Sequence, residues 1–273
     1  MIDSLRLYDW ITFFYAVSVF LYFIDFIQPS RRANRYAFWT LAVVWGLQTI
    51  FFIERMRALN YVPVFTTFEA TIFFAWLLNT FALIINYLYK MELFTFLVNI
   101  IGFAFVAFDI FARKGATQLS APMQGDLLVI HVSMALISYA AFSLACIVSI
   151  MYLFQHYMLK LKKWTPFFRR LPALERLDNL SFQMVKLGFP TLLIAMILGA
   201  IWYRVVFGHF LWLDAKPLVS LLLLIVYGVY LYLRVVLGWA GRRLAWLNVL
   251  GFCIVIVNYV LVGKFMSNFH KWG

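Results

Sequence analysis

The sequence predicts an all-α polytopic membrane protein: a helical bundle of about eight transmembrane helices with both termini external. Three observations predict this class. Hydrophobic residues make up 65% of the 273 residues and the mean hydropathy is +0.90, whereas soluble domains are roughly 45–50% apolar. Eight apolar stretches are about 20 residues long, which is enough to cross a bilayer. Basic residues concentrate in alternate connections between these stretches.

The predicted spanning helices follow one another with short connections. In chain order they cover residues 8–27, 36–54, 68–88, 93–111, 128–157, 187–206, 217–236 and 245–265. The first is longer than the apolar part of a cleavable signal peptide, roughly 7–15 residues, and carries Asp25 near its end, so we expect it to be retained. Because no linker or soluble segment interrupts the series, residues 1–273 are predicted to form a single integral membrane domain.

The net charge of +12 indicates membrane topology rather than nucleic-acid binding. Most Lys and Arg residues lie in alternate connections, which the positive-inside rule assigns to the cytoplasm. An even number of helices then places both termini outside. The longest cytoplasmic connection, residues 159–186, holds seven basic residues among Leu, Phe and Trp. It is typical of an interfacial amphipathic segment, which serves either as a membrane anchor or as a docking surface for a partner.

Polar residues at membrane depth are costly and each needs an explanation. Glu69 follows Thr66 and Thr67 at the expected start of the third helix, where capping accounts for it. The buried amides are expected to bond across helices, at about 0.6 kcal/mol each. They are Gln48, Asn79, Asn86, Asn99, Asn248 and Asn258. The external segments show no nucleophile–base pair and no paired acidic site, so we do not expect an enzyme.

Three of the four histidines fall at the predicted external face, and two of them lie at the ends of different spanning helices. His131 opens the fifth span and His270 lies near the C-terminus, while His209 lies in the external segment between the sixth and seventh spans. Two imidazoles on one face can hold a single metal centre, and haem iron is the candidate. His156 is about seven helical turns, or roughly 37 Å, from His131, so these two cannot share a ligand. Each histidine alone is equally well explained as an interfacial side chain.

Four segments resemble, in order, the membrane-bound cytochrome c assembly proteins of the CcsA/CcmC type, which handle haem. They are VPVFTTFEATIFFAW, HVSMALISYAAFSLACIVSIMYL, LERLDNLSFQMVKLGFPTLLIAMILGAIW and GWAGRRLAWLNVLGFCIVIVNYVLVGKFMSNFHKWG. The resemblance covers about residues 60–273. It implies that His131 and His270 ligate or contact the iron of haem b at the outer face.

The loop between the two histidines departs from the family pattern W-G-x-x-W-x-W-D. This chain has Phe207, Gly208, His209, Phe210, Leu211, Trp212, Leu213 and Asp214. The resemblance implies that Phe207, Phe210 and Trp212 form a platform for the ring and that Asp214 belongs to the cofactor site. His209 is then a substitute ligand or a nearby hydrogen-bonding group. Tyr232 replaces the family's membrane-embedded histidine, which puts passage of haem through the bilayer in doubt.

The full length and the opening LRLYDWITFFYAVSVFLYFIDF resemble one branch of this family, which is associated with haem-biosynthesis operons in Gram-positive bacteria. That resemblance implies a multi-pass protein of the bacterial plasma membrane that binds haem and negatively regulates tetrapyrrole synthesis by lowering the level of glutamyl-tRNA reductase. Residues 159–186 would face such a cytoplasmic partner. Two alternatives remain: a cytochrome c assembly component that delivers haem to apocytochrome c, and an interaction protein that has lost haem binding.

Overall fold

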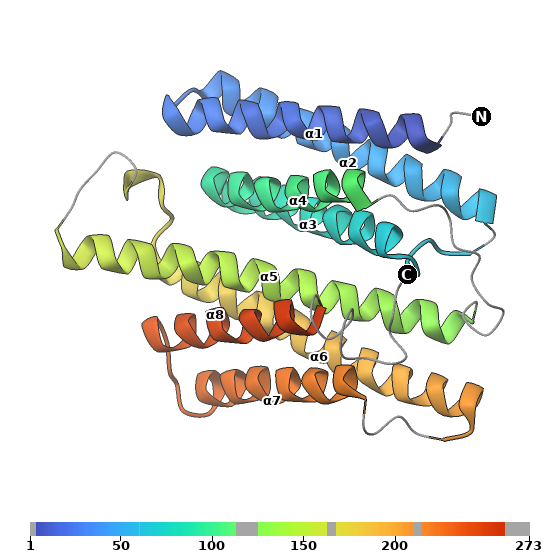
Figure 1. Cartoon of the computed structure of the whole chain (residues 1–273). Helices are drawn as coiled ribbons and strands as arrows, with labels where there is room; N and C mark the ends of the chain where they lie inside the picture. The colour runs from blue at the N-terminus through green and yellow to red at the C-terminus, as the bar shows by residue number, and fades with distance from the viewer. Residues whose placement is uncertain (1–3, 60, 113–124, 163–167, 210–213, 260–273) are drawn as a thin grey trace. The chain divides into compact units, whose positions relative to one another are not determined.

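The computed structural model describes residues 4–59, 61–112, 125–162, 168–209 and 214–259, and these residues contain helices and no strand (Figure 1). The prediction of an all-α helical bundle is confirmed. The chain divides into two compact units, Met1–Thr117 and Gln118–Gly273. We describe each unit by itself, and the single integral domain stays a prediction.

The first unit is a four-helix bundle. Its helices are α1 (Ser4–Ile27), α2 (Arg31–Leu59), α3 (Thr67–Tyr89) and α4 (Glu92–Ala112). Each packs against two others, in the closed order α1, α2, α3, α4 and back to α1. Amides join them as predicted: Asn79 Nδ2 donates to Gln48 Oε1 over 2.9 Å, and Asn99 Nδ2 donates to Ser18 Oγ over 2.9 Å.

Glu69 caps α3, as its position after two threonines predicts. The Thr66 hydroxyl accepts the Glu69 N–H, and the Glu69 carboxylate accepts the N–H groups of Phe65 and Thr66. The carboxylate is fully buried and also accepts the Arg55 Nε–H over 3.0 Å. An ion pair between α2 and α3 therefore accompanies the cap.

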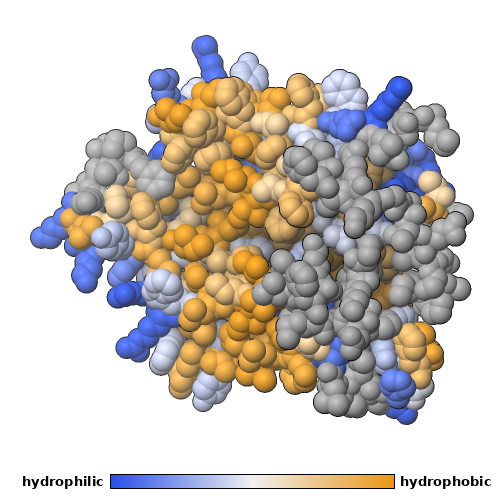
Figure 2. Space-filling model, in the orientation of Figure 1, coloured by the Kyte–Doolittle hydropathy of each residue, from blue (hydrophilic) through white to orange (hydrophobic). Residues whose placement is uncertain are grey.

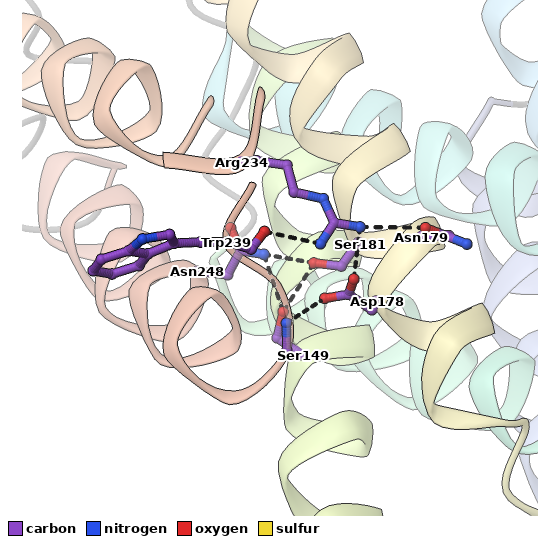
Figure 3. A network of polar contacts seen from close by, with 8 residues as sticks. Ser149, Asp178, Asn179, Ser181, Arg234, Trp239 and Asn248 are labelled. Carbon is purple, nitrogen blue, oxygen red and sulfur yellow. Dashed lines mark hydrogen bonds and ion pairs between the residues drawn. The ribbon is translucent and has the colours of Figure 1, made fainter. Parts of the chain in front are cut away.

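The second unit repeats this arrangement with α5 (Asp126–Lys160), α6 (Leu174–Phe207), α7 (Ala215–Val235) and α8 (Arg242–Ile256). The closed order of packing is α5, α6, α7, α8 and back to α5. Inside it, Asn248 Nδ2 donates to the hydroxyls of Ser149 and Ser181 over 3.1 and 2.5 Å (Figure 3). Asn258 Nδ2 likewise donates to Tyr139 Oη and Ser220 Oγ. The predicted interhelical role of both amides is confirmed.

The connection predicted over residues 159–186 is shorter than expected. Helix α5 ends at Lys160 and α6 begins at Leu174, with the short 3₁₀ helix η2 (Phe168–Arg170) between them. The residues from Leu174 to Lys186 are amphipathic, as predicted, but they form the first turns of α6. Leu177, Ser181 and Val185 are buried at helical spacing. The charged residues between them lowered the local hydropathy and concealed the helix from a search for apolar stretches.

The helices are apolar enough on their exposed faces to lie in a lipid bilayer. Six of them in the described residues, α1, α2, α3, α5, α6 and α7, are long and apolar enough to cross a membrane, and α4 is a shorter apolar helix over Glu92–Phe108. Large apolar side chains lie exposed along α6 and α7, as with Ile197 at 51% and Ile225 at 55%. Figure 2 shows hydrophobic side chains along the helices and hydrophilic ones toward the helix ends. The protein is a multi-pass membrane protein.

Candidate functional site

His131 lies in the second turn of α5 and faces the last third of α6. Its Nδ1 atom is 2.6 Å from the main-chain carbonyl oxygen of Ala195. A carbonyl oxygen only accepts, so Nδ1 carries the proton and donates it, and the neutral ring keeps its lone pair on Nε2. The ring is half-buried. The contact therefore fixes both the tautomer and the direction of the imidazole.

Gly199 makes room for this ring, one turn of α6 after Ala195. A Cβ atom placed on Gly199 would lie 2.6 Å from Cε1 and 2.7 Å from Nδ1 of His131. These distances are well inside the roughly 3.5–4.0 Å of a favourable carbon contact. The imidazole thus fills the space that a side chain at position 199 would take.

An aromatic cluster continues from this region to the end of α6. Phe207 packs against Tyr203, with ring centroids 4.6 Å apart, and edge-on against Trp202 at 6.1 Å. His209 lies edge-on to Tyr203 at 5.5 Å and is exposed. Trp202 is buried and lies beside Gly125, the residue that precedes α5. The start of α5 and the end of α6 therefore meet at the end of the unit that carries His131.

Asp214 is the N-cap of α7. Its carboxylate accepts the main-chain N–H of Lys216 over 3.0 Å, and the residue is 9% exposed. A carboxylate at a helix N-terminus is stabilised by the free N–H groups and by the helix dipole. Helix capping therefore explains why an aspartate stands at position 214. The role of Asp214 in a cofactor site, which the family pattern implies, stays a prediction.

The other predicted site residues cannot be placed. His270, Phe210 and Trp212 lie outside the described residues. The described residues include no group of three or more His, Cys, Asp or Glu side chains that could hold a metal ion. Tyr232, which stands where the family has an embedded histidine, is 54% exposed on α7. His156 lies toward the far end of α5 and stacks on Tyr152 at 6.2 Å, so it is remote from His131, as predicted.

Sequence reasoning missed the partners of His131. Ala195 acts through its main-chain carbonyl, which every residue type carries, so the sequence does not single it out. Gly199 is one of several glycines in apolar helices and is not distinguished from the others. Trp202 and Tyr203 directly precede the family's aromatic loop, so their proximity to Phe207 was a usable signal. Of these four residues, all on α6, Ala195 and Gly199 contact the histidine, and Trp202 and Tyr203 follow them on the same helix.

The residues present fit a haem group in their donor chemistry. An imidazole with Nδ1 bound to a carbonyl and Nε2 free is the usual form of a metal-binding histidine. The rings of Tyr203 and Phe207, one and two turns further along α6 than Gly199, offer an apolar, flat surface of the kind against which a macrocycle packs. His131 would offer one nitrogen to the iron, and a second would have to come from His209 or from the C-terminal segment.

Comparison with known proteins shows that the chain is similar to cytochrome c assembly proteins over most of its length. Residues 64–270 match the family described as Cytochrome C assembly protein. The chain is 41% identical over 267 residues to Protein HemX of Brevibacillus brevis, covering 97% of both chains. It is 38% identical over 274 residues to Protein HemX of Bacillus subtilis, covering 99% of both. A cytochrome c biogenesis protein CcsA of Cyanophora paradoxa is 25% identical over 307 residues, with 96% of this chain and 94% of the relative covered.

Proposed function

This chain belongs to the cytochrome c assembly protein family, and we propose that it binds haem b at its outer face and restrains tetrapyrrole synthesis. In this proposal it lies in the bacterial plasma membrane, has no catalytic activity of its own, and lowers the level of glutamyl-tRNA reductase. Near-full-length similarity to Protein HemX, rather than to the CcsA proteins alone, supports the regulatory role.

The observation that carries the haem site is the setting of His131. Its Nδ1–H is held by the Ala195 carbonyl, which leaves Nε2 as the only ring atom able to bind a ligand. His131 and His270 would hold the iron through their imidazole nitrogens. His209 would substitute for one of them or donate a hydrogen bond. Bound haem would supply an iron centre, a metal for which imidazole nitrogens are suitable ligands.

The aromatic residues at the end of α6 and in the segment that follows it would hold the macrocycle. Phe207 packs on Tyr203 at 4.6 Å, so its ring has a fixed support. Phe210 and Trp212 follow in the same external segment and would extend this platform, with Asp214 at its end. Aromatic rings provide large contact areas with preferred stacking geometries. In this arrangement the protein residues orient the ring and keep water from one of its faces.

The cytoplasmic partner would dock on the segment 159–186, at the opposite end of α5 and α6. Lys160, Lys162 and Lys186 are exposed there. Because the outer site and this surface occupy the two ends of one helical pair, haem occupancy at one end can be coupled to partner binding at the other. Such coupling requires that haem bind two arrangements of the unit with different affinities.

Absorption spectroscopy of the protein purified in detergent tests the haem site. We expect a Soret band after reconstitution with haem, and its loss or shift in His131→Ala and in His270→Ala. His156→Ala is the matched control, because this histidine lies on the same helix far from the site, and its spectrum should equal that of the wild type. Failure of the wild-type protein to take up haem added in excess would overturn the ligand assignment.

Delivery of haem to apocytochrome c is the second candidate function. The CcsA relatives, described as cytochrome c biogenesis proteins, favour it. The altered aromatic loop and the Tyr232 substitution count against it. Deletion of the gene separates the two functions: loss of mature cytochrome c supports delivery, whereas intact cytochrome c with a raised level of glutamyl-tRNA reductase supports regulation.

An interaction protein that has lost haem binding is the third candidate. It predicts that a variant lacking both His131 and His270 still lowers the reductase level in cells. Regulation that depends on bound haem predicts that the same variant behaves like the deletion.

A further inference from the structure

We propose that Gly199 and the main-chain carbonyl of Ala195 are positioning residues that hold the His131 imidazole with Nε2 directed to its ligand. This inference rests on the proposed role of His131 as an iron ligand. It adds the part of the site that aims the ligand, and it assigns a reason for a glycine in the middle of a spanning helix.

The steric part of the argument concerns the face of α6 against which the ring lies. A Cβ on Gly199 would approach Cε1, Nδ1 and Nε2 of His131 to 2.6, 2.7 and 3.2 Å. All three ring atoms lie so close to this one point that the ring occupies the place of a Cβ atom on Gly199. Any larger residue would have to push the ring away, and the ring, at the far end of its side chain, would be the part that moves.

The polar part of the argument concerns the atom that the ring binds. Ala195 precedes Gly199 by four residues, so the two lie on one face of α6. The 2.6 Å contact from Nδ1 to the Ala195 carbonyl oxygen requires the ring to stay close to that face. A carbonyl partner on the second ring nitrogen orients a metal-binding imidazole and raises its basicity. The missing side chain of Gly199 thus lets the His131 ring approach α6, and the Ala195 carbonyl accepts its hydrogen bond there.

The backbone gives no other reason for glycine here. Glycine is less favourable than alanine inside a helix by about 1 kcal/mol. Gly199 is within α6 and is absent from the glycines with positive φ, which are Gly208, Gly238 and Gly241 among the described residues. Its conformation is open to any residue, so the requirement comes from the ring and not from the chain.

Gly188 on the same helix provides a matched comparison. A Cβ there would meet the Phe142 ring of α5 at 2.6 Å, the same distance as the closest approach at Gly199. Phe142 stacks on Tyr227 with ring centroids 3.7 Å apart and has no polar ring atom. The two glycines therefore pose the same steric problem, but only one of them bears on a candidate ligand.

The experiment compares haem complexes of the wild type, Gly199→Ala and Gly188→Ala by absorption and electron paramagnetic resonance. We expect a six-coordinate, low-spin iron in the wild type. In Gly199→Ala the displaced imidazole should weaken haem binding by roughly 10–100-fold, the usual effect of losing an outer-shell partner, and move part of the iron to high spin. Gly188→Ala should keep the low-spin spectrum. An unchanged low-spin spectrum and haem affinity in Gly199→Ala would overturn the proposal.

A haem-free measurement keeps this result separate from the proposed function. Thermal unfolding is compared for Gly199→Ala in the wild-type and in the His131→Ala backgrounds. If the ring occupies the space at position 199, the alanine lowers the melting temperature only when His131 is present, and raises it or leaves it unchanged when His131 is absent. An equal drop in both backgrounds would overturn the contact. A wild type that shows this difference but binds no haem would refute the haem site while leaving the contact intact.

Discussion

Arg234 of α7 and Asp178 of α6 form an ion pair, with Nη2 and Oδ2 2.6 Å apart and each side chain 15% exposed. The same two side chains bind the turn that follows α7: Arg234 Nη1 donates to the Trp239 carbonyl oxygen, and Asp178 accepts the Gly241 N–H (Figure 3). One ion pair thus ties α6, α7 and the start of α8 together.

Removal of Arg234 is expected to destabilise the second unit. Arg234→Ala leaves Asp178 without its cation, and we expect a loss of about 3 kcal/mol in the free energy of unfolding, at the low end for buried pairs because both side chains keep some exposure. Arg234→Lys should recover only part of this, since an ammonium lacks the planar fork that reaches the carboxylate and the carbonyl together. Equilibrium unfolding in mixed micelles measures both losses.

Asn179→Ala is the control for this prediction. Asn179 is exposed and accepts a longer, 3.3 Å bond from the same guanidinium. Its removal should change the free energy of unfolding by no more than about 0.5 kcal/mol. If Asn179→Ala lost as much free energy of unfolding as Arg234→Ala, Asn179 and not Asp178 would be the partner through which Arg234 stabilises the unit.

Asn248 offers a test of the amide that joins three helices. Asn248→Ala removes the two bonds from Nδ2, but Ser149 and Ser181 still bond to each other over 3.0 Å, so we expect a loss of only about 1 kcal/mol. Asn248→Asp keeps the shape and places a carboxylate inside the bundle, at a cost of about 3 kcal/mol. If the aspartate variant were the more stable of the two in an unfolding titration, solvent would have to reach this position.

The amides and the cap of α3 were predictable because their cause is local or general. A buried amide in a spanning helix must bond to a neighbouring helix, and Thr66 three residues before Glu69 is a capping pattern in the sequence itself. The start of α6 was not predictable from hydropathy, since Arg176 and Lys186 mask the buried stripe of Leu177 and Val185.

The candidate site was predictable only in its residue types. His131 was found from its place at the end of an apolar stretch and from family resemblance. Its partner is a main-chain oxygen 64 residues away, and its packing surface is a missing side chain. Neither the hydrogen bond to the carbonyl nor the contact at Gly199 can be predicted from residue types, because both depend on how α6 is rotated against α5.

Glu69 should be essential to the first unit. Glu69→Ala removes the partner of Arg55 and the oxygen that accepts the N–H groups of Phe65 and Thr66, and we expect a loss of about 3–5 kcal/mol. Glu69→Gln retains one carbonyl acceptor and should lose less, while Thr66→Ala should cost about 1 kcal/mol as a simple loss of a cap. If Thr66→Ala lowered the free energy of unfolding by more than Glu69→Ala does, the proposed contribution of the Arg55–Glu69 ion pair would be wrong.

The predicted orientation of the second unit can be measured with single cysteines. Lys162 and His209 are both exposed, beside opposite ends of the α5–α6 pair. In a background with Cys146 and Cys253 replaced, we expect a membrane-impermeant maleimide to label His209→Cys in intact cells. Lys162→Cys should be labelled only after the membrane is opened. The reverse pattern would place the basic connection, and with it the partner surface, outside the cell.

Neutralising the basic surface should uncouple regulation from haem binding. The triple variant Lys160→Gln, Lys162→Gln and Lys186→Gln removes two exposed cations at the end of α5 and one in the fourth turn of α6 while leaving His131 untouched. Because attraction to an acidic partner falls with each cation removed, we expect the level of glutamyl-tRNA reductase to rise toward that of a deletion strain. The haem spectrum of the purified variant should remain that of the wild type.

The connection between α1 and α2 supplies the matched control for that variant. Arg31, Arg32 and Arg35, in the first two turns of α2, are also exposed and carry the same total charge, so their replacement by Gln tests whether charge at the predicted cytoplasmic face alone matters. We expect this second triple variant to keep the reductase low. Equal effects of the two variants would point to a general change in membrane topology or insertion, which the cysteine labelling detects. A first variant that still lowers the reductase fully would place the partner surface elsewhere on the protein.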